Sequence, residues 1–577
     1  MALTTESSRV TTRPSWLVAP IALPRLSAVV SAHVVVVGAA ILLAVMAGLV
    51  AARLNTLFLS THPFQGDSSS YYYYQLQAYF TAQRQGAWEA IKDQLATNGR
   101  NPLRILPYLV FAPQLLADPN GHLVSSCIML AAFLALLGIT VYRRCGSLPW
   151  ALVALAVVPS ALRFFDPQFG LGFNFPDLPA MFLVGAALLA LLNSDEGRSG
   201  PWLVAFGTLA ALAALARFVT AGYTLVMCGP ILAYFLLKRA WLERNVVRGV
   251  IVPSILVGLP LVLIAGNFLL KFSAENVRFY SVAGYALGAK FDQVVANIGI
   301  GFSLYFGVAG AAALVLIAVF YVLRFGDSGP NWSTLGVTLW AAAAHILLVL
   351  FVLRLTEYPE QPLYALPGIY LLALAPFAVK RKFVHPSRTV EWLTSLALIV
   401  TLGWVSFQAY REAVVRVASA NNYDQRSLKF DQDSAFVLVN NAASIHGRAP
   451  VFDTVFFQYG PRIVGVAGFR DKTQLIYSSQ FETHMGGWRL RYPDLNEDAI
   501  KAEQYALAVK TLDFVLVMPH PRAPEAKILF NNDLSIDVVE DMQRRITADT
   551  NVWRLIQPLS SPWGEIDLYQ NVPRSST

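Results

Sequence analysis

Long apolar runs separated by shorter polar segments make up most of the first 410 residues of the chain. A transmembrane helix needs about 20 mostly apolar residues, and about eleven stretches reach or approach that length. We therefore predict a polytopic all-α membrane domain over residues 29–410, preceded by a tail of residues 1–28. The expected spans cover residues 29–51, 122–142, 148–164, 178–193, 201–216, 218–237, 248–270, 298–324, 335–355, 363–379 and 389–410.

The pattern changes after residue 410 to one typical of a soluble domain. Short apolar runs predict β-strands at Phe436–Val439, Val451–Phe457, Ile463–Val466, Phe514–Met518 and Glu565–Tyr569. Apolar positions at helical spacing predict helices at Ile500–Leu512 and Ile536–Thr550. Because strands that alternate with helices are typical of α/β domains, we predict a small α/β domain over residues 411–577.

Composition agrees with a membrane protein, since 55% of the residues are hydrophobic, only 14% are charged, and the mean hydropathy is +0.50. The net charge of +8 does not indicate nucleic-acid binding, because the basic residues gather in particular loops. The three cysteines, Cys127, Cys145 and Cys228, lie in or beside apolar spans, so we expect no disulfide framework.

The basic loops predict how the chain crosses the membrane. Clustered Lys and Arg residues mark cytoplasmic loops. Such residues occur at Arg143 and Arg144, Arg198, Lys238–Arg248, Arg324 and Lys380–Arg388. We therefore expect a retained cytoplasmic N-terminal tail, an odd number of spans, and residues 411–577 on the outer side.

The stretch His62–Tyr74 opens a long first outer loop over residues 53–121. Asp67 is the first carboxylate after the first span, and Gly66 before it permits a turn. The loop has two expected amphipathic helices, separated at Gly86, and a basic turn at Asn98–Arg104. Asp67 is a candidate general base or metal ligand. The alternative is an N-cap on a helix in the membrane interface, with its tyrosines in the aromatic belt.

Further charged residues are expected at the same membrane face as Asp67. The acids are Asp166 and Asp177, and the arginines are Arg104, Arg163, Arg217 and Arg354. Charge close to hydrocarbon is costly and often functional. Arginine binds phosphate oxygens bidentately, and an acid can deprotonate an attacking hydroxyl, so this set suits a reaction on a membrane-anchored phosphate. The alternative is that each arginine snorkels and each aspartate pairs with one.

Three short motifs carry a resemblance to a known family: Asp67 with Tyr71–Tyr74, Phe175–Ala180 and Tyr364–Pro367. With the expected architecture, they resemble the GT-C superfamily of membrane glycosyltransferases, which includes protein O-mannosyltransferases and the lipid A aminoarabinose transferase. The chain departs from the family in two places: a serine follows Asp67 where many members have a second acid, and no Asp-x-Asp occurs in the second outer loop. It also lacks the Trp-Trp-Asp signature of oligosaccharyltransferases, which disfavours protein N-glycosylation.

The resemblance implies transfer from a polyprenyl-phosphate sugar donor to a glycan or glycolipid acceptor at the outer face of a bacterial cytoplasmic membrane. Inversion would use Asp67 as base, with Asp177 or Asp166 as an orienting or metal-holding partner. Mg²⁺ or Mn²⁺ dependence is left open, with Asp67 and Asp166 as candidate ligands. The implied phosphate-binding residues are Arg217, Arg354, Arg163 and Arg104, and the implied acceptor- or sugar-binding residues are Tyr71, Glu357 and Tyr364. A lipid-linked glycan polymerase or ligase is the alternative, followed by a multi-span transporter.

Overall fold

The computed structural model describes the N-terminal half of the membrane region, one later helix and parts of the C-terminal region. The described residues are 26–59, most of 71–97, 102–160, most of 164–238, 247–256, a few between 259 and 344, 388–419, 451–455, 476–477, 497–511, 514–521, 536–560 and 564–575.

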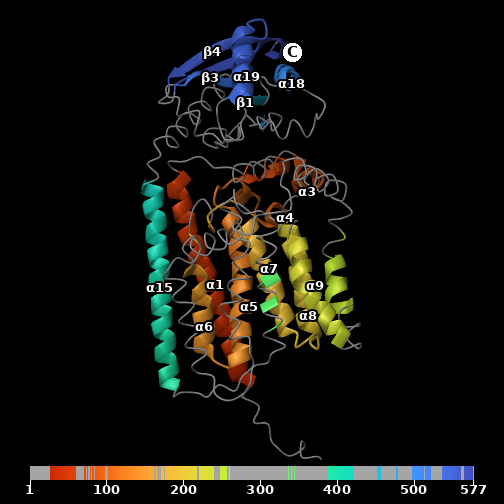
Figure 1. Ribbon diagram of the computed structural model, residues 1–577, viewed down its shortest axis with the longest axis vertical. Coiled ribbons are helices and arrows are strands. Elements are labelled where there is room, and N and C mark those ends of the chain that lie inside the picture. The colour runs from red at the N-terminus through yellow and green to blue at the C-terminus, as the bar shows by residue number, and fades with distance from the viewer. Residues whose placement is uncertain are drawn as a thin grey trace, which may run out of the picture.

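The described part of the membrane region is a bundle of roughly aligned helices (Figure 1). Three of them are long and apolar enough to cross a membrane: α1 (Leu26–Leu59), α5 (His122–Cys145) and α15 (Arg388–Ser419). The shorter apolar helices are α6 (Leu148–Val157), α7 (Asp177–Asn193), α8 (Gly200–Ala216) and α9 (Thr220–Lys238). These seven helices lie at expected spans. The total of eleven stays a prediction, because most of the other spans lie outside the described residues.

Helix α1 shows why this sequence packs as a bundle. One of its faces is lined by small and apolar residues that are buried against α5 and α6, including Val36, Ala40, Ala47 and Ala51. Its other face exposes apolar residues such as Leu42, as expected for a side in contact with lipid. Small residues let membrane helices approach closely, and dispersion contacts then stabilise the pair.

Helix α7 lies between α5 and α8 at the centre of the described bundle (Figure 1). Every residue from Asp177 to Asn193 is buried. A helix that is apolar on all sides must be enclosed by other helices or by lipid, and here α5 and α8 pack against it. The polar residues at the two ends of α7 are therefore held at fixed places in the bundle.

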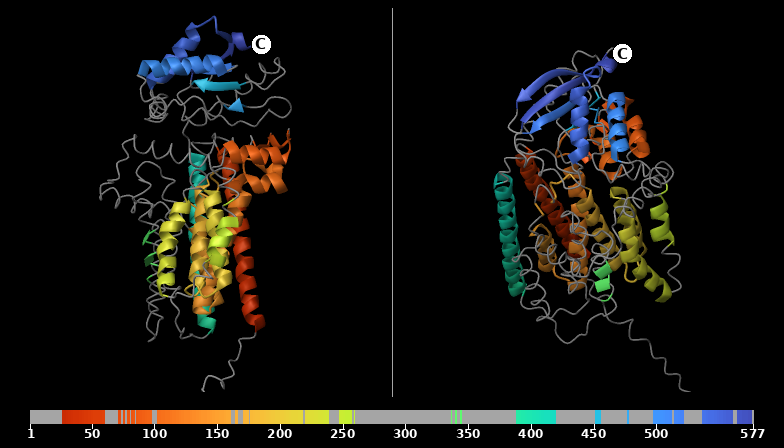
Figure 2. Two further views of the ribbon diagram at one scale, coloured as in Figure 1. Left: turned by 90° about the vertical axis from the view of Figure 1, so that its right-hand side faces the viewer. Right: turned by 45° about the horizontal axis from the view of Figure 1, so that its top comes forward.

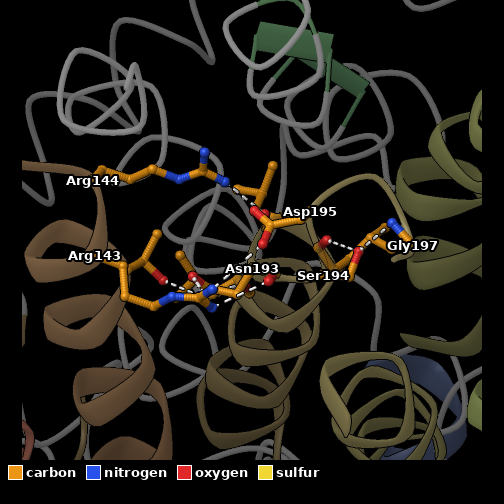
Figure 3. A network of polar contacts seen from close by, with 10 residues as sticks. Arg143, Arg144, Asn193, Ser194, Asp195 and Gly197 are labelled. Carbon is orange, nitrogen blue, oxygen red and sulfur yellow. Dashed lines mark hydrogen bonds and ion pairs between the residues drawn. The ribbon is translucent and has the colours of Figure 1, made fainter. Parts of the chain in front are cut away.

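One end of α7 is held by a network of arginines from α5 (Figure 3). Arg143 donates to the carbonyl and side-chain oxygens of Asn193 at 3.1 and 3.2 Å, and Arg144 donates to the Leu192 carbonyl at 2.7 Å. The last carbonyls of a helix have no partner within the helix, and cations near them are favourable. Two arginines that were expected only to orient the chain thus also join α5 to α7.

The opposite end of the bundle, called here the first-loop end, has the helices of residues 71–116 packed on it (Figure 2). The helix break expected at Gly86 is confirmed: its φ is +93°, and α3 (Ala87–Thr97) begins at the next residue. The turn expected at Asn98–Arg104 is wrong at its C-terminal end. Pro102 begins α4 (Pro102–Phe111), because proline is well suited to a first helical position, and Arg104 lies on that helix.

The described C-terminal strands form one five-stranded mixed sheet in the order β2-β1-β3-β5-β4. Its strands are β1 (Val451–Val455), β2 (Ile476–Tyr477), β3 (Phe514–Pro521), β4 (Trp553–Ser560) and β5 (Gly564–Asn571). Strands β1, β2 and β3 are parallel, whereas β5 runs antiparallel to β3 and β4. Helices α18 (Glu497–Thr511) and α19 (Ile536–Ala548) are the other main elements, and all lie beyond the first-loop end (Figure 1).

Strands β1, β3 and β5 and both helices coincide with expected elements, whereas β2 and β4 were not expected. The expected strands Phe436–Val439 and Ile463–Val466 lie outside the described residues. The proposed boundary of this domain at residue 411 stays a prediction.

Candidate functional site at the first-loop end of the bundle

The site begins with a helical hairpin. Helices α7 and α8 have 17 residues each and are joined by the short segment 194–199 at the opposite end of the bundle. Two antiparallel arms of equal length bring the start of the first helix beside the end of the second. Asp177 begins α7, and Arg217 directly follows α8. Accordingly, the Arg217 Nε lies 3.2 Å from the Asp177 Oδ1.

The two partners in this ion pair differ in exposure. The Asp177 side chain is fully buried, whereas the Arg217 side chain is 26% exposed. A buried carboxylate is costly unless it is paired with a cation, so Asp177 fixes the position of Arg217. The exposed part of Arg217 is the part of the pair that a ligand can reach.

Tyr71 joins the first loop to this ion pair. The Arg217 Nη1 donates to the Tyr71 hydroxyl oxygen at 2.6 Å. Tyr71 is 8% exposed and lies on the helical segment that precedes Gly86. A hydrogen bond from a charged donor is about twice as strong as one between neutral groups. The contact therefore ties the first loop to the hairpin.

A second guanidinium, that of Arg104 on α4, lies within the same polar cluster. Arg104 is 2% exposed, and its Nη2 donates to the Asn174 Oδ1 at 2.6 Å. The Asn174 Nδ2 donates in turn to the Gln75 Oε1 at 3.4 Å. In the part of the chain that the structure describes, the Arg104 Nε and Nη1 find no acceptor.

Burial lowers the pKa of Arg104 to about 10, and the nearby Tyr108, Tyr71 and Asp177 oppose that shift. The guanidinium therefore stays cationic at neutral pH. The cost of burying its charge indicates that the position has a role, because buried polar groups without partners are rare in native proteins.

Two further side chains brace the backbone around Arg104. The ring nitrogens of His122 lie 3.1 Å from the carbonyl oxygens of Pro119 and Gly172. The Tyr108 hydroxyl donates to the Gly121 carbonyl at 2.9 Å and accepts from the Ser125 amide at 2.7 Å. The contact to Gly172 holds the segment that precedes Asn174 and α7.

The charges of this cluster do not balance among the described residues. Arg104 and Arg217 contribute two positive charges, and Asp177 contributes one negative charge. Asn174, which accepts from Arg104, is neutral, and so is Gln75, which accepts from Asn174. Among the described residues the cluster thus carries a net positive charge, and guanidinium groups match the geometry of phosphate.

The depth of the cluster suits a lipid headgroup. A helix of 17 residues is about 25 Å long, whereas the hydrocarbon core of a bilayer is about 30 Å thick. If the Asn193 end of α7 is placed at one boundary of the hydrocarbon core, then Asp177 and Arg217 lie near the opposite boundary or slightly inside it. That is where the phosphate of a membrane-anchored lipid meets the apolar layer.

Four of the residues expected at the site, Tyr71, Arg104, Asp177 and Arg217, lie together in this cluster. Sequence reasoning missed Asn174 and Gln75. Asn174 comes three residues before Asp177, and Gln75 lies one helical turn after Tyr71, but neither spacing reveals which partner it meets. The other expected site residues lie outside the described part of the chain: Asp67, Asp166, Arg163, Arg354, Glu357 and Tyr364.

The described residues contain no group of three His, Cys, Asp or Glu side chains that could hold a metal ion. Asp177 is engaged with Arg217, whose cation competes with a metal for that carboxylate. The expected metal ligands, Asp67 and Asp166, are outside the described residues, so a divalent metal stays a hypothesis.

The sequence matches no family model and no curated protein, but the structure is similar to solved ones. One is ArnT from Cupriavidus metallidurans in the apo state, with a TM-score of 0.50 and 12% identity. Another is the same protein bound to undecaprenyl phosphate, with a TM-score of 0.51 and 11% identity. Each comparison covers 92% of this chain and 98% of the other.

The chain has an ArnT-like fold. This likeness supports the polytopic helical membrane architecture expected from the sequence. At these identities the likeness concerns the fold alone. The expected relation to protein O-mannosyltransferases stays a prediction, as do the orientation of the chain in the membrane and the roles of the site residues.

Proposed function

We propose that this protein is a membrane glycosyltransferase that transfers a sugar from a polyprenyl-phosphate-linked donor to a glycan or glycolipid acceptor. The reaction takes place at the outer face of the bacterial cytoplasmic membrane. The observation that carries the proposal is the cluster of Arg217, Arg104, Asp177 and Tyr71 at the end of an ArnT-like bundle. A solved ArnT structure bound to undecaprenyl phosphate supports a lipid phosphate as the ligand class.

Each arginine has a distinct part in holding the donor. Arg217 is partly exposed, so it contacts the phosphate directly, while Asp177 and Tyr71 fix the direction of its guanidinium. Arg104 is buried and adds positive charge from within the cluster. Arg354 and Arg163 are further candidates for the phosphate, and Tyr71, Glu357 and Tyr364 are candidates for the sugar and acceptor.

In the proposed reaction, the acceptor hydroxyl oxygen attacks the anomeric carbon of the donor sugar. The bond from this carbon to the phosphate oxygen breaks, and its electron pair leaves with polyprenyl phosphate. Asp67 accepts the hydroxyl proton as general base. Attack from the side opposite the leaving group inverts the anomeric configuration. Cations that are already in place stabilise the charge that develops on the phosphate.

The location of the charges favours a transferase over a transporter. Transporters bind their substrates near the middle of the membrane, at discontinuous helices. Here Asp177 begins α7, and Arg217 follows the last residue of α8, so both lie at helix ends. This arrangement suits chemistry on a headgroup at the membrane surface.

Lipid binding tests the proposal directly. The purified protein in nanodiscs should bind undecaprenyl phosphate and bind undecaprenol, which lacks the phosphate, far more weakly. Arg217→Gln should weaken binding about 10- to 100-fold, the equivalent of about 1.5–3 kcal/mol for a charge-assisted hydrogen bond. Arg411→Gln is the matched control, because Arg411 is an exposed arginine of α15. Equal binding of both lipids by the unmodified protein would contradict the proposal.

A further inference from the structure

The partners of Arg104 are chemically unusual for a buried arginine. A buried guanidinium commonly pairs with a carboxylate, because an uncompensated charge in a poorly solvated place is costly. The acceptor that holds the Arg104 Nη2 at 2.6 Å is instead the neutral amide oxygen of Asn174. Asn174 is itself 1% exposed and is held by the amide of Gln75, which is 2% exposed.

This amide chain connects three segments that are distant in sequence. Arg104 belongs to α4, Gln75 to the helical segment that contains Tyr71, and Asn174 to the segment that precedes α7. A neutral acceptor fixes the direction of the guanidinium without pairing its charge directly with a carboxylate. Guanidinium presents five N–H donors. Asn174 takes one of them, and Nε and Nη1 have no acceptor among the described residues.

We infer that Asn174 is a positioning residue that holds Arg104 through a neutral contact, so that the charge of Arg104 acts on an anionic lipid headgroup bound at Arg217. The inference rests on the lipid-phosphate function proposed above. It goes beyond that function because it makes an uncharged residue, Asn174, responsible for the preference of the site for an anionic ligand. A carboxylate at position 174 would fit the same space but would neutralise Arg104. The asparagine amide thus determines the charge of the site as well as its shape.

The decisive variant is Asn174→Asp, which keeps the shape of the side chain and adds one negative charge. Its carboxylate can still accept from the Arg104 Nη2. It cannot donate to Gln75 as Asn174 does, but the Gln75 amide can rotate and donate to it instead. We therefore expect the melting temperature in detergent to stay close to that of the unmodified protein. Affinity for undecaprenyl phosphate should fall about tenfold or more, because the added negative charge repels the phosphate through a medium of low effective dielectric. A purely structural role for Asn174 would leave the affinity unchanged when the fold is intact.

Two further variants separate charge from shape. Asn174→Ser keeps a neutral acceptor, so its affinity should stay within about threefold of the unmodified protein, the equivalent of less than 1 kcal/mol. Asn193→Asp is the matched control. It places the same charge on another buried asparagine, beside Arg143 at the opposite end of α7, and should leave lipid affinity unchanged.

The outcomes distinguish this inference from the proposed function. If the unmodified protein does not prefer undecaprenyl phosphate over undecaprenol, the proposed function fails. If it does, and Asn174→Asp folds and binds as tightly as the unmodified protein, only the inference about Asn174 is wrong. An equal loss of affinity in Asn174→Ser and Asn174→Asp would also overturn it, because the effect would then come from shape. If Asn174→Asp does not fold, Arg104→Gln replaces it, and unchanged affinity in that variant would overturn the inference.

Discussion

Replacing Asp177 by asparagine tests the central contact of the site. The change keeps the size of the side chain and removes the carboxylate that lies 3.2 Å from the Arg217 Nε. Removing one partner of a fully buried ion pair costs about 3–5 kcal/mol, because the other charge stays buried without compensation. For Asp177→Asn we expect the free energy of unfolding to fall by less, about 2–3 kcal/mol, because the Arg217 side chain is 26% exposed and water can solvate it.

The assay is thermal unfolding of the purified protein in detergent, with and without undecaprenyl phosphate. A ligand that binds the folded state stabilises it by about 2.7 kcal/mol at a concentration of 100 Kd. In Asp177→Asn the phosphate supplies the missing negative charge beside Arg217. The lipid should therefore raise the melting temperature more in the variant than in the unmodified protein.

Asp541→Asn is the matched control for this experiment. Asp541 pairs with Arg545 at 2.6 Å on α19, and the Arg545 side chain is 40% exposed. Ion pairs between residues one helical turn apart contribute about 0.3–0.5 kcal/mol when exposed, and this pair is partly exposed, so the control should melt close to the unmodified protein. The reasoning is wrong if Asp177→Asn is as stable as this control and shows the same lipid-induced shift as the unmodified protein.

Two other predictions concern the chemistry and the packing of the bundle. Asp67→Asn should lower the transfer rate about 10²–10⁴-fold with the fold intact, because general-base catalysis contributes that much. Near-normal turnover of the variant would show that Asp67 is an N-cap and not the base. Loss of activity of the unmodified protein on adding a chelator would indicate that the reaction needs a metal ion. Gly48→Ala should destabilise the contact of α1 with α5, because an added Cβ overlaps the Cys127 Sγ, at a cost of about 1 kcal/mol or more. The double variant Gly48→Ala with Cys127→Ala should regain the melting temperature of the unmodified protein. If it does not, the overlap with Cys127 is not the cause of the destabilisation.

The sequence by itself determined most of the described elements and the end of the bundle at which Asp177 and Arg217 lie. Apolar runs of sufficient length specify membrane helices, because backbone polar groups in lipid must be satisfied within the segment. Those runs predicted α1, α5 and α7 without any tertiary information. Asp177 and Arg217 were predicted at one membrane face, because each lies at the end of such a run. Gly86 was predicted to separate two helices, and it does so in a conformation that favours glycine.

Only the tertiary structure decided which charges meet and which stay uncompensated. Arg104 and Asn174 are 70 residues apart, and Gln75 and Asn174 are 99 residues apart. Helical periodicity reports only neighbours within a few turns, so it assigned Arg104 to a turn and did not select Asn174 or Gln75. Their contacts depend on the equal arms of the α7–α8 hairpin and on the packing of α4 against the end of the bundle. Since the cost of a buried charge depends on its surroundings, the sequence specifies the charges, and the packing around them determines which are balanced.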